Sequence, residues 1–277
     1  MNSLNTWPLP DKLRITGIFT DIDDTLTTHG AITPDALAAL GELRAAGLSV
    51  IAITGRPVGW CEEFARTWPV NAIVPENGAV LLQNTRKNGL QPNEYGRKQL
   101  LKTYQQSNVL RADNYARMQR IGQRILHEVP GTALAQDSDG RETDMAIDHS
   151  EFTNLPPEKI AQVVAIMQAE GMTATVSSIH INGWFGAHNK LTGAHWAVRE
   201  LFGRDLALEM NDWVYVGDST NDQLMFEAFA NSIGVANVRR FEAQLTTLPR
   251  YITDGERGAG FAQVVQAILQ ARAIKTL

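Results

Sequence analysis

Two aspartates, Asp21 and Asp23, stand two positions apart just after the apolar run of residues 15–19. An apolar run that passes into a polar segment is typical of a buried strand that ends in a loop. Side chains two positions apart in an extended segment point the same way, and two nearby carboxylates repel unless a cation or a shared proton lies between them. The spacing therefore predicts a divalent-metal site with one carboxylate free for chemistry, and a solvated acidic turn is the alternative.

A second acidic pair stands far along the chain, after the short apolar run of residues 213–216. Gly217 lets the chain leave this predicted strand without a side chain in the way, and Asp218 and Asp222 follow it. Parallel α/β sheets place their sites at the carboxyl ends of strands, so the two acidic pairs can meet there. A set of oxygen ligands suits Mg²⁺, a hard cation, better than zinc.

Two further segments could bind a phosphoryl group. The predicted strand that begins near residue 47 ends in Thr54, Gly55 and Arg56, which offer a hydroxyl, a flexible backbone N–H and a guanidinium. Lys190 lies near the start of a predicted amphipathic helix and would supply a fixed cation. The alternatives are an ordinary polar loop for the first segment and a solvated surface lysine for the second.

The spacing between these groups indicates two structural units. Between residues 26 and 54 there is room for a hairpin and one helix, residues 34–46. The much longer stretch between Thr54 and Lys190 repeats a pattern of one helix and two strands. Its predicted elements are helices 114–129 and 157–170, and strands 132–136, 143–147, 173–176 and 179–182. We therefore expect a compact α+β unit with one face of its sheet free.

Taken together, these motifs resemble those of the haloacid dehalogenase superfamily of phosphohydrolases. DIDDTL resembles the first motif of that family, the strand ending in Thr54 its second, Lys190 its third and GDSTND its fourth. The long insertion is similar to the cap of the IIB members. The resemblance implies an α/β fold: a Rossmann-like parallel-sheet core, residues 1–84 and 187–277, with an inserted α+β cap of the C2B type, residues 85–186.

The resemblance also implies a mechanism for this chain. Asp21 would attack phosphorus and form an aspartyl phosphate, which divides one difficult displacement into two steps. Asp23 would protonate the leaving oxygen and then take a proton from the hydrolytic water. Thr54 and Lys190 would hold the phosphoryl oxygens as charge redistributes.

A cofactor follows from the same resemblance. Mg²⁺ would be held by the Asp21 carboxylate, by the main-chain carbonyl of Asp23 and by Asp218. Asp222 would act through a metal-bound water or by orienting Lys190. Asn221, Gly55 and Arg56 are further residues predicted to bind phosphate or substrate. For Asn221 the alternative is that it supports its loop and does not touch the substrate.

Substrate contacts are expected from the cap and from the segment before it. His180, Asn182, Trp184 and His188 are candidates for binding hydroxyls or stacking on a sugar ring, because pockets combine an apolar wall with a few polar groups. Asn77, in the segment of residues 75–82, is a further candidate. For Trp184 the alternative is packing at a hinge, and for His188 it is a helix cap.

The chain is similar to sucrose-phosphate, mannosyl-3-phosphoglycerate and Cof-type phosphatases, and Leu191 departs from the glycine that often follows the motif lysine. The expected function is therefore a Mg²⁺-dependent phosphatase of a sugar phosphate or similar small phosphorylated metabolite, with mannosyl-3-phosphoglycerate and sucrose phosphate as candidate substrates. A phosphomutase and a non-catalytic protein that binds a phosphorylated ligand are the alternatives. A dehalogenase is disfavoured, since that chemistry needs neither a metal nor an acid at Asp23.

Composition limits the number of domains and the classes of partner and compartment that we expect. A chain of 277 residues can hold one large or two modest domains, and its net charge of −5 predicts no basic surface for nucleic acid. The single cysteine, Cys61, excludes an internal disulfide and fits a reducing cytoplasm. The N-terminal segment lacks an apolar signal core and no run approaches membrane-spanning length, so we expect a cytoplasmic protein without a membrane partner.

Overall fold

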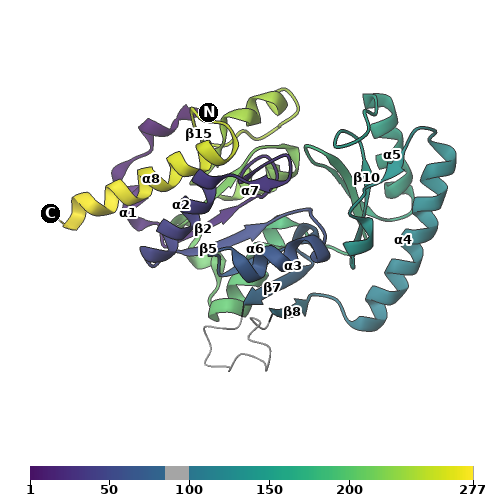
Figure 1. Ribbon diagram of the computed structural model, residues 1–277, viewed down its shortest axis with the longest axis horizontal. Helices are drawn as coiled ribbons and strands as arrows, with labels where there is room; N and C mark the ends of the chain where they lie inside the picture. The colour runs from purple at the N-terminus through teal and green to yellow at the C-terminus, as the bar shows by residue number, and fades with distance from the viewer. Residues whose placement is uncertain (85–99, 277) are drawn as a thin grey trace.

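The structure is a computed structural model that describes residues 1–84 and 100–276. Nine strands of this part of the chain form one sheet (Figure 1). From β1 to β6 in spatial order the neighbours run parallel, and β7 and β8 extend the sheet antiparallel. In spatial order the strands are β1 (Asn2–Ser3), β15 (Tyr251–Ile252), β14 (Ser232–Gly234), β13 (Trp213–Gly217), β2 (Gly17–Thr20), β5 (Ser49–Ile53), β6 (Ala72–Val74), β7 (Val80–Asn84) and β8 (Leu100–Tyr104). The predicted α/β class with a mainly parallel sheet is confirmed.

Helices cover both faces of this sheet, because successive strand residues point to opposite sides. On β2, Ile18 packs with one hydrophobic cluster and its neighbour Phe19 with the other. The first cluster contains residues of α2 (Pro34–Ala45), α3 (Val58–Thr67) and α8 (Arg257–Thr276), and the second contains residues of α6 (Lys190–Phe202) and α7 (Gln223–Ala228). Both faces of the strands are therefore buried, which explains their continuous apolar runs.

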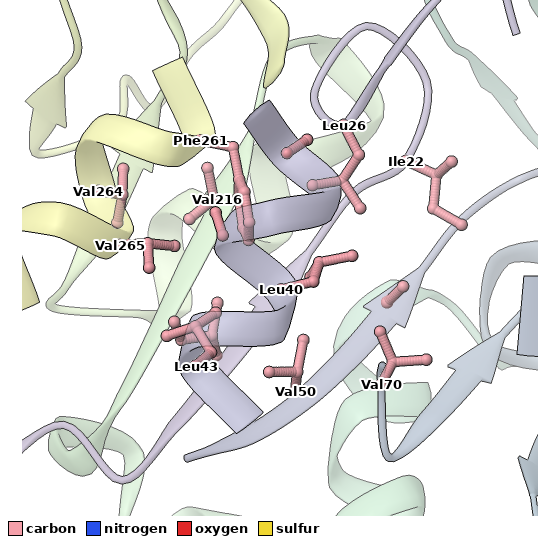
Figure 2. Packing of buried hydrophobic residues seen from close by; sticks show 14 of the residues in the cluster. Ile22, Leu26, Leu40, Leu43, Val50, Val70, Val216, Phe261, Val264 and Val265 are labelled. Atoms are coloured by element: carbon pink, nitrogen blue, oxygen red, sulfur yellow. The ribbon is translucent and has the colours of Figure 1, made fainter. Parts of the chain in front are cut away.

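The loop that carries the first acidic pair is anchored on this core. Ile22 and Leu26 flank the loop residues Asp23 to Thr25 and are both fully buried in the first cluster. Figure 2 shows both side chains in this cluster together with Leu40 of α2. Burying a leucine or isoleucine side chain stabilises the fold by about 1.5–3 kcal/mol, so this loop is held by its apolar residues and its carboxylates are free to face the site.

The inserted unit is a four-stranded antiparallel sheet with two helices on one face (Figure 1, right side). Met145 and Ile181 point toward those helices, whereas Asn182 lies on the opposite face, toward the core. Side chains alternate along a strand, so one face stays available for the site, as predicted. The elements are α4 (Asn108–Glu128), α5 (Pro157–Ala169), β9 (Ala133–Leu134), β10 (Asp144–Asp148), β11 (Thr173–Val176) and β12 (His180–Trp184).

Two predicted boundaries differ from the structure. β8 pairs with β7 of the nine-stranded sheet, whereas the prediction counted all of residues 85–186 as one inserted unit; residues 85–99 lie outside the described residues. Hydrophobic periodicity identifies a strand but not the sheet that it joins. The helix predicted from residue 114 begins at Asn108, after the cap Ser107. The prediction missed this first turn because its apolar residues, Val109 and Leu110, are exposed and do not continue the buried stripe of the helix.

Short elements complete the described chain. A two-stranded hairpin, β3 (Thr27–Thr28) and β4 (Ala31–Ile32), turns through His29 and Gly30, which both have positive φ as this tight turn requires. No helix among residues 1–84 and 100–276 combines the length and the apolar character needed to cross a bilayer. The remaining helices are α1 (Leu9–Arg14) and the 3₁₀ segments η1 (Leu4–Thr6), η2 (Glu76–Gly78), η4 (Ser138–Gly140), η5 (Leu206–Leu208), η6 (Met210–Asp212), η7 (Thr220–Asp222) and η8 (Ala236–Phe241).

Candidate active site

Asp21 follows β2 at the carboxyl end of the sheet and is 4% exposed, so it is no solvated turn residue. Its backbone N–H donates to the carbonyl of Val216 on β13, and this bond brings the two predicted acidic pairs together. Its carboxylate lies 2.9 Å from Lys190 Nζ. Burial raises the pKa of Asp21 to about 7, against the lowering effect of Lys190 and with a further rise from Asp222 and Asp23.

Lys190 is the first residue of α6 and is buried. The cap Asn189 and Thr192 form a capping box that fixes where this helix begins, and therefore where the lysine stands. Its Nζ lies 2.9 Å from Asp21 and 2.7 Å from Asp222. Burial acts to lower the pKa of Lys190, but the two carboxylates raise it above its ordinary value, so the ammonium stays charged.

The Asp222 carboxylate is surrounded by donors. One oxygen accepts from Lys190 Nζ and from the hydroxyl of Tyr215, and the other accepts from the backbone N–H groups of Asp218 and Ser219 at 2.8 and 3.1 Å. Bonds from charged and backbone donors to both oxygens hold such a carboxylate in one orientation. The bond from Lys190 is the contact that the predicted orienting role of Asp222 requires, and that role stays a prediction.

Two glycines permit the close approaches that this arrangement needs. A Cβ on Gly217 would lie 2.4 Å from Asp222 Oδ2, so any side chain there would displace that carboxylate. Gly78 has a φ of +107°, and a Cβ on it would lie 2.4 Å from the carbonyl of Asn189. Glycine at both positions lets the turn after β6 pack directly against the start of α6.

Three carboxylates could hold a metal ion. Asp21, Asp218 and Asp222 each offer an oxygen, and these atoms lie within 4.8 Å of one another. Asp218 also accepts from Asn237 at 3.0 Å, and Thr25 Oγ1 lies 3.5 Å from its other oxygen. Burial raises the pKa of Asp218 well above its ordinary value, and the Asp222 and Asp21 carboxylates add to the rise. A crowded, buried set of oxygen ligands fits a hard divalent cation, which would relieve this repulsion.

Asp23 does not share that cluster; its carboxylate pairs with Arg56. Both oxygens accept from Arg56 Nε, at 3.1 and 2.9 Å. The two terminal nitrogens of the same guanidinium reach the inserted unit, at 3.1 Å from Asp137 and 2.9 Å from Glu151. Arg56 thus joins three carboxylates across the two units. Its predicted contact with phosphate stays a prediction.

Thr54 lines the floor of the site on the core side, and Asn77 is bonded to it. Thr54 Oγ1 accepts from the backbone N–H of Arg56 at 3.1 Å, and the carbonyl of Thr54 accepts from the N–H of Asn77 at 2.9 Å. Asn77 has a φ of +54°, and its buried Nδ2 has no partner among the described residues. A buried donor without a partner is costly unless a ligand or water meets it. This orphan lies beside Gly55, which supports Asn77 as a predicted binding residue.

The free face of the inserted sheet closes over this floor. Asn182 Nδ2 donates to the carbonyl of Gly55 at 3.3 Å, and His180 Nε2 lies 2.8 Å from Glu151, the partner of Arg56. Between the units lies a cavity of about 10 Å³. Its lining includes the predicted residues Asp21, Asp23, Thr54, Gly55, Arg56, His180, Asn182 and Asn221, together with Ser177, Ser178 and Ile179.

Trp184 and His188 lie elsewhere. Their rings stack with centroids 5.6 Å apart, and Trp184 Nε1 donates to the backbone carbonyl of His188 at 2.9 Å. Neither side chain lines the cavity at Asp21. Both are buried where the chain returns from β12 to α6, which agrees with the packing alternative for Trp184. The cap of α6 is Asn189 and not His188.

We expect His188 to make the protein sensitive to acid. Burial lowers the pKa of His188 to about 4 from its ordinary 6.5, so the unfolded chain takes up this proton first as the pH falls. The stability linked to His188 is therefore lost between about pH 6.5 and pH 4, by roughly 3 kcal/mol. Urea unfolding at pH 7, 5.5 and 4 should show a smaller loss for His188→Gln. The exposed His127→Gln is the control, and equal pH dependence in the His188 variant and the wild type would contradict the assignment.

Several residues at the site were not predicted. Tyr215 bonds Asp222, and Glu151 and Asp137 bind Arg56. The buried Glu76 accepts from the backbone of Val58 in the core and of Glu142 in the inserted unit. Only Tyr215 has a signal in the sequence: it precedes Gly217 by two positions on an apolar strand, where a hydroxyl must find a buried partner. The others lie in polar segments whose partners are remote in the sequence.

Known proteins resemble this chain over most of its length. The family model for haloacid dehalogenase-like hydrolases matches residues 18–264. A protein of Streptococcus pyogenes serotype M6, provisionally named a phosphatase, is 23% identical over 279 residues, which covers 89% of this chain and 95% of that protein.

Solved structures share the fold at low sequence identity. The Thermoplasma acidophilum 0175 protein has a TM-score of 0.68 at 15% identity, covering 92% of this chain and 98% of that one. The sucrose-phosphatase of Synechocystis sp. PCC6803, solved with sucrose and phosphate, has a TM-score of 0.62 at 16% identity, with 91% and 97% covered. Both likenesses extend over the core and the inserted unit alike.

Proposed function

This chain belongs to the haloacid dehalogenase-like hydrolase family, and we propose that it is a Mg²⁺-dependent phosphatase of small phosphorylated metabolites. The observation that carries the proposal is the position of Asp21. It is a buried carboxylate at a strand end, in contact with the ammonium of Lys190 and next to two further carboxylates. A nucleophile, a fixed cation and a cation site at one point are the parts that phosphoryl transfer needs.

In the proposed reaction, Asp21 attacks phosphorus and the bond to the ester oxygen breaks as the new bond forms. Asp23 gives its proton to the leaving oxygen, so the product departs as an alcohol. Water then attacks the phosphorus of the aspartyl phosphate and gives a proton to Asp23. Phosphate leaves and Asp21 is regenerated, so each cycle consumes one water. Arg56 Nε contacts both Asp23 oxygens, so in this reaction one of these oxygens must leave that contact to carry the proton.

Asp21, Asp218 and Asp222 are the residues whose carboxylates would hold Mg²⁺. When bound, the ion would offset the negative charge of the phosphoryl group and of the acidic cluster. Lys190 remains charged in the site and would bind a phosphoryl oxygen through its Nζ. Thr54 and the unpaired amide of Asn77 would donate to the same group.

The test is a panel of phosphate esters with purified protein, with Mg²⁺ and with a chelator in its place. We expect Mg²⁺-dependent release of inorganic phosphate from sugar phosphates, sucrose phosphate and mannosyl-3-phosphoglycerate being included. Release without any bisphosphate activator separates a phosphatase from a phosphomutase. The absence of hydrolysis of every ester, p-nitrophenyl phosphate included, would contradict the proposal.

Asp23→Asn should separate the two proton transfers from the attack on phosphorus. The variant keeps the nucleophile but cannot protonate a leaving alcohol, so we expect kcat on a sugar phosphate to fall about 10²- to 10⁴-fold. With p-nitrophenyl phosphate, whose leaving group needs little protonation, formation of the aspartyl phosphate should fall much less. Single-turnover kinetics on both esters measure this step, and equal losses would remove Asp23 from the role of general acid.

A further inference from the structure

A cavity of about 100 Å³ lies within the inserted unit, apart from the small cavity at Asp21; the described residues that line the two are all different. Helix α4 forms one wall, and η4, β9 and β10 form the other. Part of this lining is apolar, with Met118, Leu134 and Met145, and part is polar, with the buried Arg141 and Asp144. One water needs about 10–15 Å³, so the cavity has space for a small molecule.

Arg141 brings an unpaired donor to this wall. Its side chain is 2% exposed. Nη1 donates to Asp144 at 2.8 Å and to the carbonyl of Gly55 at 3.0 Å, and Nη2 donates to Asp137 at 3.1 Å. Nε, in contrast, is buried and has no partner among the described residues. A buried donor without a partner is costly, so a molecule that offers an acceptor here would stabilise the arrangement.

The same arginine connects the cavity to the loop after β5. The carbonyl of Gly55 in that loop accepts from Arg141 and also from Asn182, at 3.0 and 3.3 Å. Asp144 holds both donors, since one of its oxygens accepts from Arg141 at 2.8 Å and the other from Asn182 at 3.1 Å. A shift of Arg141 at the cavity wall would therefore reach Gly55 through direct hydrogen bonds.

We propose that this cavity binds a small uncharged molecule with one hydrogen-bond acceptor on an apolar body, such as a short amide, and that the bound molecule is coupled to the loop after β5. Met118, Leu134 and Met145 would contact the apolar body. Arg141 Nε would donate to the acceptor. A cavity of about 150 Å³ can hold benzene, so this smaller one suits roughly four to five non-hydrogen atoms.

The charges of the lining favour an uncharged ligand. Arg141 is the one cation among the described lining residues, and it is already paired with Asp137 and Asp144. Burial raises the pKa of Asp144 to about 8, against the lowering effect of Arg141. Where Asp144 takes up a proton, the ion pair with Asp137 remains, and Asp139 adds a further carboxylate to the lining. A buried anion needs a cation that is free to pair with it, and an uncharged acceptor does not.

Methionine methyl signals test the binding, because Met118 and Met145 line the cavity. In protein with ¹³C-labelled methionine methyl groups, acetamide should shift both signals with one saturable Kd, on the order of millimolar for so few atoms. The methyl of Met225, buried in the core, should not move. The backbone amide signals of Gly55 and Arg56 should shift with the same Kd if the coupling holds. Acetate, the nearly isosteric anion, should bind at least about tenfold more weakly.

Gly122→Ala narrows the cavity without removing a polar group. Gly122 lines the cavity from α4, and a Cβ on it would lie 3.2 Å from Met145 Cε and 3.6 Å from Leu134 Cδ2. We expect the Kd of acetamide to rise about tenfold, the effect of one methyl group in an apolar pocket. Alanine is favoured over glycine within a helix, so the variant should fold. Gly41→Ala in α2 is the matched control, since a Cβ there meets nothing within 4 Å, and its Kd should equal that of the wild type.

Arg141→Lys keeps the cation but removes Nε, and a variant with a cooperative thermal transition should bind acetamide at least about fivefold more weakly. A titration without saturable shifts at Met118 and Met145 would show that the cavity holds water only and would overturn the inference. Equal or tighter binding of acetate, an unchanged Kd in Gly122→Ala, or binding that leaves the Gly55 signal in place would do the same. None of these measurements uses ester hydrolysis, so their outcome is independent of the proposed function.

Discussion

Asp21→Asn should abolish Mg²⁺-dependent phosphate release, with kcat lowered about 10⁴-fold or more. The amide is nearly the same size as the carboxylate but cannot attack phosphorus, and it removes one negative charge from the cluster with Asp218 and Asp222. The measurement is steady-state release of phosphate by a variant whose intact mass shows no deamidation. Because the loss lies in the nucleophile, sugar phosphates and p-nitrophenyl phosphate should be affected alike.

The Asp21→Asn protein should remain folded. The side chain ends a strand that is held by backbone bonds and by the buried Ile22, which the substitution leaves unchanged. A cooperative thermal transition near that of the wild type is the control for folding. Turnover similar to the wild type in such a preparation would remove Asp21 from the role of nucleophile and the proposed mechanism with it.

Lys190→Met should damage both activity and stability. Within residues 1–84 and 100–276, Lys190 is the one cation that contacts both Asp21 and Asp222, and methionine replaces it with an apolar chain of similar length. Removing one partner of a buried ion pair costs about 3–5 kcal/mol because the other charge is left buried without compensation. The loss of a preorganised charge at the phosphoryl group should lower kcat about 10²- to 10³-fold on every ester.

Urea unfolding of Lys190→Met measures the loss of unfolding free energy, and phosphatase assays measure the loss of kcat. Lys12→Met, at a partly exposed lysine of α1, is the matched control and should change neither. Mg²⁺ should recover part of the lost stability, since a ligand that binds only the folded state stabilises it. A Lys190→Met protein with unchanged stability and turnover would show that the contacts of Lys190 contribute neither to folding nor to catalysis.

The carboxylate cluster and its lysine could be predicted from the sequence because of sheet geometry. Asp21 and Asp218 each follow a short apolar run, and the ends of neighbouring parallel strands lie at one edge. The repeated pattern of one helix and two strands likewise predicted a free sheet face, and in the structure Met145 and Asn182 lie on opposite faces of that sheet. These predictions depend on local rules that hold wherever a strand is buried.

Contacts between the two units could not be predicted in this way. Arg56 follows a strand end, as a phosphate-binding arginine would, yet in the structure it binds Asp23, Asp137 and Glu151. Trp184 lies on a strand of the free face, yet it packs on His188 at the return to the core. The partner of a long polar or aromatic side chain depends on which segments approach it in space, and sequence spacing contains no such information.

The sequence by itself therefore determined the α/β class, the family and the residues at the ends of β2, β5, β13 and the start of α6. Strand periodicity and helix capping are local properties of the chain, and they suffice to place those residues at one edge. Only the tertiary structure showed that Asp222 accepts a hydrogen bond from Lys190, and that Asp137 and Glu151 of the inserted unit pair with Arg56 of the core. These features arise where the inserted unit packs against the core, and they depend on the charges and volumes that the packing brings together.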